Sequence, residues 1–235
     1  MLTELQQNII AQTIHFVKSG SEGESTGHDW WHISRVEKLA VHLAGKEKAE
    51  LFLVRLAALL HDVDDWKFNA IGSAHAENWL KSLDVEAETR EKVLHIIAQV
   101  SYKGAGEDTT PDSIEAKVVQ DADRLDALGA IGIARAFAYG GSKQREIYDP
   151  EVLPVMHADF EAYKTKVSHT INHFYEKLLL LKDRLHTSAA RELAEKRHEF
   201  MEEFLKNFFE EWNFEEDGSQ KMEDRSRKTG DGRRK

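Results

Sequence analysis

The sequence predicts a single all-α domain, and three observations lead to that prediction. Apolar residues recur three and four positions apart in nearly every patterned segment, which is the period of an α-helix. No stretch alternates convincingly between apolar and polar residues as a half-buried strand does. Only three prolines occur in 235 residues, so few positions would interrupt a helix. Because neither an internal repeat nor a linker separates two cores, we expect one helical bundle.

Five helices are expected in the first part of the chain. The first carries Ile10, Ile14 and Val17 at helical spacing and is followed by Gly20. The second is expected to stop at Gly45, because glycine commonly follows the last residue of a helix. The expected ranges are about 2–18, 28–44, 47–62, 73–83 and 86–102.

The rest of the chain is expected to add three long helices. Asp112 is interpreted as an N-cap because Glu115 stands three residues later, which is the spacing of a capping box. This helix is expected to continue through a run of small residues until Gly140 interrupts it. The expected ranges are about 112–128 with that continuation, 157–184 and 188–214.

The domain is expected to span residues 1–214, followed by a charged carboxyl-terminal tail over 215–235. The last nineteen residues hold seven Lys or Arg against four Asp or Glu and lack aliphatic side chains. Such a composition cannot build a core and is typical of disorder. The tail is therefore expected to be disordered, and its role is left open.

Charge and composition limit the classes of function. The formal net charge of −10 argues against a protein that binds polymeric nucleic acid, although a bound cation would still attract small anionic substrates. No apolar run is long enough to cross a bilayer, and no secretory signal is recognised. The absence of cysteine excludes disulfides and fits a reducing compartment. A cytoplasmic protein without a membrane partner is therefore expected.

The strongest candidate for a functional site lies at the end of one predicted helix. An apolar run that ends at Leu60 is followed by five ionisable side chains within residues 61–67. His61 shares a helix face with Val54 and Ala58. A polar group on a buried face is costly unless it is hydrogen-bonded, paired or bound to a metal ion.

Two further predicted helices offer matching groups. His32 lies on the apolar stripe of its helix, and Asp121, Asp123 and Asp126 follow in a third segment. Two imidazoles with two carboxylates form a mixed nitrogen and oxygen site suited to Mn, Fe, Co, Ni or Zn. The helical wheel of the third segment places Asp121 nearest the apolar centre. A buried hydrogen-bonded cluster without a metal is the alternative interpretation.

Longer segments around these groups resemble a known family. They read HDWWHISRV from His28, AALLHD ending at Asp62, and QDADRLDALGAIGIAR from Gln120. In this order they resemble the HD superfamily of metal-dependent phosphohydrolases, and within it the bacterial YpgQ/YedJ-like nucleotide pyrophosphohydrolases. The resemblance covers roughly residues 5–210. It implies an all-helical HD-domain bundle that hydrolyses a phosphate ester or anhydride of a nucleotide.

The resemblance also implies which residues bind the metal. The implied ligands are His32, His61, Asp62 and Asp123. Asp121 stays the alternative to Asp123, because the helical wheel favours it. One divalent ion is expected, with Mn preferred and Mg, Co, Ni, Fe or Zn also compatible.

Other residues are expected to act on water or on the substrate. Related enzymes often place an acidic residue beside the attacking water at the position of Asp65, which is therefore the expected catalytic residue. Lys67 and Arg35 are basic groups close in sequence to the ligands and are expected to contact phosphate. Asp126 is expected to orient either a ligand or a substrate hydroxyl. His28 is expected to contact the substrate.

The expected reaction is hydrolysis of a nucleoside triphosphate to a monophosphate and pyrophosphate. A nucleoside monophosphatase or a cyclic phosphodiesterase would use the same metal centre, and a nucleotide-sensing protein would keep it without turnover. A helical scaffold whose tail recruits a partner is a further alternative. Trp30, Trp31 and Trp66 are expected either to line a pocket for the base or to fill the core. The sequence does not decide the base preference or whether the protein is a homo-oligomer.

Overall fold

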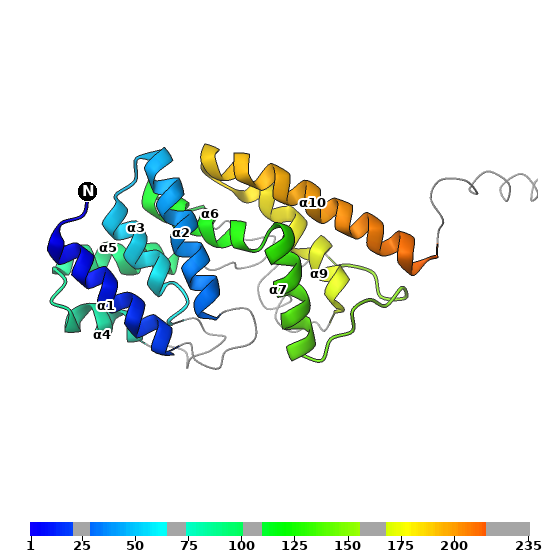
Figure 1. The fold of residues 1–235 in the computed structure, drawn as a ribbon, viewed down its shortest axis with the longest axis horizontal. Helices are drawn as coiled ribbons and strands as arrows, with labels where there is room; N and C mark the ends of the chain where they lie inside the picture. The colour runs from blue at the N-terminus through cyan, green and yellow to red at the C-terminus, as the bar shows by residue number, and fades with distance from the viewer. Residues whose placement is uncertain (21–28, 65–73, 101–109, 156–167, 215–235) are drawn as a thin grey trace, which may run out of the picture.

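The computed structural model describes residues 1–20, 29–64, 74–100, 110–155 and 168–214. Within these ranges the chain is helical and holds no strand, which confirms the all-α prediction. In Figure 1, α1 to α5 gather at one end of an elongated molecule and α10 runs along the other. The elements are α1 (Glu4–Gly20), α2 (Trp30–Glu47), α3 (Leu51–Leu60), α4 (His75–Ser82), α5 (Ala87–Ala98), α6 (Ile114–Asp126), α7 (Gly129–Ser142), α9 (Thr170–Glu176), the 3-10 helix η1 (Leu178–Arg184) and α10 (Ser188–Trp212).

The helix α3 is the buried centre of the amino-terminal half. All of its residues from Phe52 to Leu60 are buried except Arg55, whose guanidinium donates to Glu37 at 2.6 Å. A helix that is apolar on almost every face needs neighbours on every side, and α1, α2, α5 and α6 supply them. The carboxyl end of α3, where His61 follows, therefore lies inside the bundle.

The end of α2 lies beyond its predicted position. The helix continues through Gly45, and the left-handed residue that follows it is Lys48, with φ of 60°. The extra turn has a structural use, because the Glu47 carboxylate accepts hydrogen bonds from Ser188 Oγ and Ala189 N, both at 3.0 Å. These bonds join the end of α2 to the start of α10.

The start of α6 lies one residue later than predicted. Ser113 is the N-cap, and its hydroxyl accepts a hydrogen bond from Ala116 N at 3.1 Å. Asp112 instead accepts hydrogen bonds from His95 of α5 and from Gln99, the residue that follows α5. Because its carboxylate is engaged there, Asp112 ties α5 to α6 rather than capping the helix.

The predicted continuation of α6 through the small-residue run is wrong. α6 ends at Asp126, and α7 leaves it in a new direction (Figure 1). Gly129 makes this turn with φ of +74°, a conformation that is costly for residues with a Cβ atom. A Cβ at this position would also approach the Arg197 side chain to 3.2 Å. Glycine is therefore required where the two helices meet.

The long helix predicted over 157–184 is also wrong in its described part. His169 is the N-cap of α9, and its Nδ1 accepts a hydrogen bond from Asn172 N at 3.1 Å. α9 is only seven residues long, and η1 replaces its expected continuation. Residues 156–167 lie outside the described part of the chain.

The helix α10 crosses both halves of the molecule. It packs against α2 and α6 as well as against α7 and η1. Near its carboxyl end, the rings of Phe209 and Trp212 lie 5.3 Å and 5.0 Å from the ring of Tyr148. The tail over 215–235 lies outside the described residues, so its disorder stays a prediction. Across the described residues, no helix has both the length and the hydrophobicity to cross a membrane.

Candidate metal centre

Side chains from three parts of the sequence converge where α3 ends. His32 comes from α2, His61 follows the last residue of α3, and Asp123 comes from α6. One candidate ligand atom of each lies within 4.8 Å of the others. His32 Nε2 is 3.5 Å from Asp123 Oδ1, and His61 Nε2 is 3.8 Å from the same oxygen. The structure thus brings these predicted groups to one point.

Asp62 joins this cluster from the end of α3. One of its carboxylate oxygens lies 3.4 Å from His32 Nε2, and the other lies 3.4 Å from His61 Nε2. Both imidazoles are buried, whereas the side chain of Asp123 is 30% exposed. A set of nitrogen and carboxylate ligands that is open on one side is typical of catalytic metal sites.

Hydrogen bonds fix the proton of each imidazole on the side away from the cluster. His61 Nδ1 lies 2.8 Å from Ala58 O. Because a carbonyl oxygen can only accept, Nδ1 carries a proton, and in the neutral ring Nε2 carries the lone pair. His32 Nδ1 lies 2.8 Å from Asp126 Oδ2 in the same way. In the neutral form of each ring, Nε2 therefore presents a lone pair to the two carboxylates.

A cation would resolve the repulsion that this arrangement creates. His61 Nε2 is buried and makes no hydrogen bond within the described residues, while Asp62 and Asp123 place negative charge beside it. A buried acceptor without a partner costs about 1–3 kcal/mol, and the neighbouring charges add to that cost. The residues present therefore fit a divalent metal ion.

Asp126 lies behind His32 and fixes the orientation of its ring. Burial alone would raise the pKa of Asp126, but hydrogen bonds from His32 and Arg35 hold this pKa well below its usual range. The side chain is only 2% exposed, and Arg135 Nη1 also donates to it at 3.0 Å. A carboxylate behind a metal-binding histidine is a common means of fixing that ring. The geometry therefore favours ligand orientation over contact with a substrate hydroxyl.

Protonation in the metal-free cluster follows from the same contacts. Burial acts to lower the pKa of His32, but hydrogen bonds with Asp126 and Asp62 raise it above its usual value. Burial acts to raise the pKa of Asp123, but the charges of His61 and His32 lower it below its usual value. A metal ion that binds these groups would displace protons from the imidazoles, so its binding would release protons.

Asp121, the alternative ligand, is engaged elsewhere. Its buried carboxylate accepts hydrogen bonds from Thr187 N at 2.8 Å, Thr187 Oγ1 at 2.7 Å and His186 N at 3.0 Å. These donors lie at the amino end of α10, where backbone N–H groups lack partners within the helix. The helical wheel correctly indicated a buried Asp121, but Asp123 is the carboxylate that meets the histidines.

Some predicted site residues cannot be placed. Those outside the described part of the chain are His28, Asp65, Trp66 and Lys67, and the roles expected for them stay predictions. Arg35 is described, and its guanidinium reaches Asp126 through Nε at 2.7 Å and Nη2 at 3.0 Å. Trp30 packs partly buried against the core, whereas Trp31 is 62% exposed.

Sequence reasoning missed two contacts of the cluster, those of Ala58 O and Arg135. A backbone carbonyl carries no residue-specific signal, so the Ala58 contact was not predictable from its side chain. Arg135 reaches Asp126 only because α7 turns away from α6 at Gly129. That glycine was the one available signal, and the run of small residues around it concealed the turn.

The comparisons with known proteins identify the class. A family model of the HD domain matches residues 30–128, a range that includes all four predicted ligands. The uncharacterised protein YpgQ of Bacillus subtilis is 44% identical over 195 residues, which cover 81% of this chain and 87% of YpgQ. The chain therefore belongs to the HD domain superfamily, and the predicted family is confirmed.

Solved structures agree with this assignment. A protein of Lactobacillus plantarum superposes with a TM-score of 0.81 at 37% identity, covering 91% of this chain and 100% of that one. An HD-superfamily hydrolase of Bacillus thuringiensis gives a TM-score of 0.69 at 47% identity, covering 88% and 98%. YpgQ in complex with ADP gives a TM-score of 0.69 at 40% identity, covering 86% and 97%.

Proposed function

We propose that this protein is a divalent-metal-dependent phosphohydrolase that cleaves nucleoside triphosphates to a monophosphate and pyrophosphate. The observation that carries the proposal is the convergence of His32, His61, Asp62 and Asp123, with Nε2 of both imidazoles facing carboxylate oxygens. The Bacillus thuringiensis hydrolase of the same superfamily supports hydrolysis as the reaction. The complex of YpgQ with ADP supports a nucleotide as the ligand.

The cluster supplies the groups that metal-assisted hydrolysis needs. A divalent ion held by these residues would lower the pKa of a coordinated water and withdraw charge from a phosphoryl oxygen. Arg35 uses Nε and Nη2 to bind Asp126, and a guanidinium has five N–H donors in all. Further donors therefore remain to neutralise charge on a phosphate. Asp65 is proposed to accept the proton of the attacking water.

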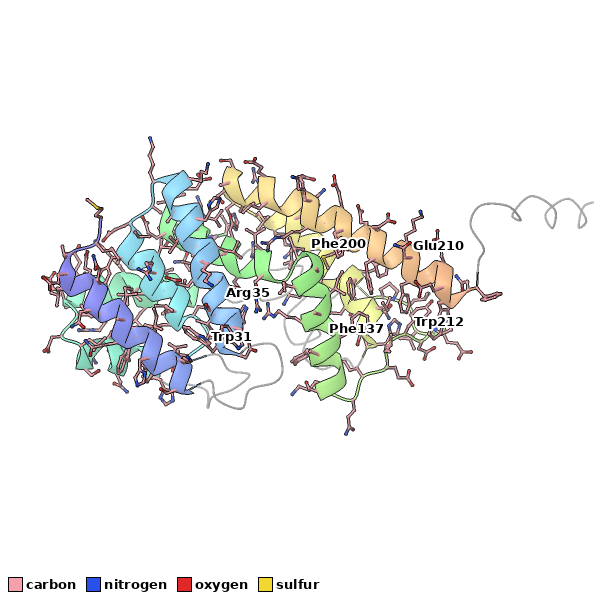
Figure 2. The ribbon with its side chains drawn as sticks, viewed as in Figure 1. Trp31, Arg35, Phe137, Phe200, Glu210 and Trp212 are labelled. Atoms are coloured by element: carbon pink, nitrogen blue, oxygen red, sulfur yellow. The ribbon has the colours of Figure 1, made fainter. Side chains whose placement is uncertain are left out.

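Trp31 supports a nucleoside phosphate over a simple phosphate ester. It precedes His32 in α2 and lies one helical turn before Arg35, so both side chains share one face of the helix. Figure 2 shows Trp31 and Arg35 on the side of α2 toward α7. An exposed indole offers a stacking surface for a base, while the guanidinium beside it suits a phosphate.

Product analysis tests the proposal directly. Metal-stripped protein would be incubated with nucleoside triphosphates, monophosphates and cyclic monophosphates, each with Mn, Mg, Co or Ni. Monophosphate and pyrophosphate in equal amounts, formed only with metal, are the expected products. His61→Ala serves as the control, because it removes one ligand and should abolish this product with every metal.

The remaining alternatives are separate outcomes of this experiment. Orthophosphate from monophosphates would indicate a phosphatase, and opening of a cyclic nucleotide would indicate a phosphodiesterase. Saturable nucleotide binding without any product would indicate a sensor. In ¹⁸O-labelled water, label in the monophosphate would show attack at the α-phosphorus, whereas label in pyrophosphate would show attack at the β-phosphorus. Asp65→Asn should keep the metal and lose turnover, and parental turnover would remove Asp65 from the reaction.

A further inference from the structure

Arg135 belongs to α7, a helix that carries none of the candidate ligands. Its side chain is 16% exposed, and its Nη1 donates to Asp126 Oδ2 at 3.0 Å. The same oxygen lies 2.8 Å from His32 Nδ1. Arg135 is therefore separated from a candidate metal ligand by a single carboxylate.

The donors around the Asp126 carboxylate are unevenly shared between its oxygens. Oδ2 accepts hydrogen bonds from His32 Nδ1, Arg35 Nη2 and Arg135 Nη1, whereas Oδ1 accepts one from Arg35 Nε. A carboxylate oxygen offers about two lone-pair directions. Three donors that share one oxygen therefore leave the carboxylate little freedom to rotate. Without Arg135, Oδ2 would lose one of the three donors that fix its position opposite His32 Nδ1.

The carboxyl-terminal half of the molecule determines where Arg135 lies. α7 packs against α9 and α10. At the turn that precedes α7, Arg197 of α10 lies against Gly129 and donates through Nη1 to Leu125 O near the end of α6. These contacts fix the direction in which α7 leaves α6, and hence the position of the Arg135 guanidinium above Asp126.

We propose that Arg135 is a positioning residue of the metal centre. By holding Asp126, Arg135 fixes the ring of His32. The affinity for a divalent ion therefore depends on the position of α7 relative to α6. The inference rests on the metal site of the proposed function and goes beyond it. Metal affinity would then depend on α7, a helix that contributes none of the predicted ligands.

Cobalt binding by the metal-stripped full-length chain tests the inference without any substrate. Titration with Co²⁺ gives the affinity, and the visible absorption of the bound ion reports the ligand geometry. Arg135→Met removes the guanidinium but keeps an unbranched apolar stem. Its affinity is expected to fall about 10-fold, the lower end of the range for losing a group in direct contact with a metal ligand, because Arg135 acts through Asp126. Its absorption band is expected to change.

A matched arginine provides the control. Arg145 follows the end of α7 and lies over the ring of Tyr139, 5.5 Å from the ring centroid. Arg145→Met should therefore keep the parental affinity and spectrum. Arg135→Lys keeps the charge but offers a single donor point in place of the planar fork, so its affinity should fall between those of the parent and Arg135→Met.

The outcomes that would overturn the inference are distinct from those that would overturn the proposed function. Parental affinity and spectrum in Arg135→Met would overturn it, and so would an equal loss in Arg145→Met. If circular dichroism shows that Arg135→Met does not fold, parental affinity in Arg135→Lys would overturn it. Binding of Co²⁺ by the parent without nucleotide products would contradict the hydrolase alone, whereas no Co²⁺ binding by the parent would remove the site and this inference together.

Discussion

Asp121 and Asp123 lie two residues apart on α6, yet the two faces of this helix surround them with opposite chemistry. Toward α10, Asp121 receives backbone and hydroxyl donors from His186 and Thr187. Toward α2 and α3, Asp123 meets His32 and His61, each of which turns its Nε2 atom toward the carboxylate. The carboxylate that meets fixed donors stabilises the fold, and the carboxylate that meets two imidazole Nε2 atoms forms a site that suits a cation.

Burial alone does not separate these two roles. Asp121 is fully buried and Asp123 is 30% exposed, so a search for buried charge would select the structural residue. What distinguishes Asp123 is that its neighbours use Nδ1 on other acceptors, Ala58 O for His61 and Asp126 for His32, which leaves Nε2 of both rings to face the cluster. The hydrogen bonds one step away from the cluster therefore identify the metal site.

The largest expected effect is loss of the metal in Asp123→Ala. The affinity for Mn²⁺ or Co²⁺ should fall more than about 100-fold, beyond the range expected for a group behind a ligand. In the parent, metal at a hundred times its Kd should stabilise the fold by about 2.7 kcal/mol. Thermal unfolding with and without metal would show this gain in the parent and not in Asp123→Ala. If metal stabilised Asp123→Ala as much as the parent, Asp123 would be removed from the ligand set.

The second effect is a loss of stability in Asp121→Ala. The substitution leaves the Thr187 and His186 donors without their carboxylate, and we expect the free energy of unfolding to fall by about 3 kcal/mol. Urea unfolding of the metal-free protein measures this change. Protein that remains folded should bind metal with near-parental affinity. If Asp121→Ala lost metal and Asp123→Ala lost stability instead, the assignment of the two faces would be reversed.

The sequence predicted the membership of the cluster better than its surroundings. His32, His61, Asp62 and Asp123 could be named because the motif order carries them. The helical wheel could not rank Asp121 against Asp123, because α6 is buried on both faces and a wheel shows only one apolar centre. The contact of Arg135 with Asp126 joins two helices whose relative direction no pattern along the chain encodes.

The helix boundaries show the same limit. The sequence predicted most helices, but it placed the start of α6 at Asp112 because a capping box matched there. The side chains of His95 and Gln99 engage that carboxylate instead, which is a tertiary contact. The sequence also predicted α6 and α7 as one helix, because the alanine and isoleucine residues around Gly129 continue the helical pattern. The positive φ at Gly129 ends the helix there, and no residue pattern indicates it.

A smaller effect is expected on the substrate side of the cluster. If Trp31 stacks on a base, Trp31→Ala should raise KM for a nucleoside triphosphate about tenfold, since stacking of a base on an aromatic ring contributes about 1–3 kcal/mol. The metal affinity and kcat should change little. Trp212→Ala, at the exposed far end of α10 (Figure 2), is the matched control. Equal KM values in the parent and Trp31→Ala would place the base elsewhere.

The smallest expected effect is that of Gly129→Ala, which tests whether the two faces of α6 depend on each other. Gly129→Ala forces a Cβ into a left-handed conformation and toward Arg197, which should lower the free energy of unfolding by about 1–2 kcal/mol. Gly45→Ala is the control, because it lies within α2 with open space around it and should gain about 0.5–1 kcal/mol. If the turn seats Arg135 above Asp126, Gly129→Ala should also weaken Co²⁺ binding by the folded protein. Lower stability with parental Co²⁺ affinity would show that the fold and the metal centre tolerate strain at this turn independently.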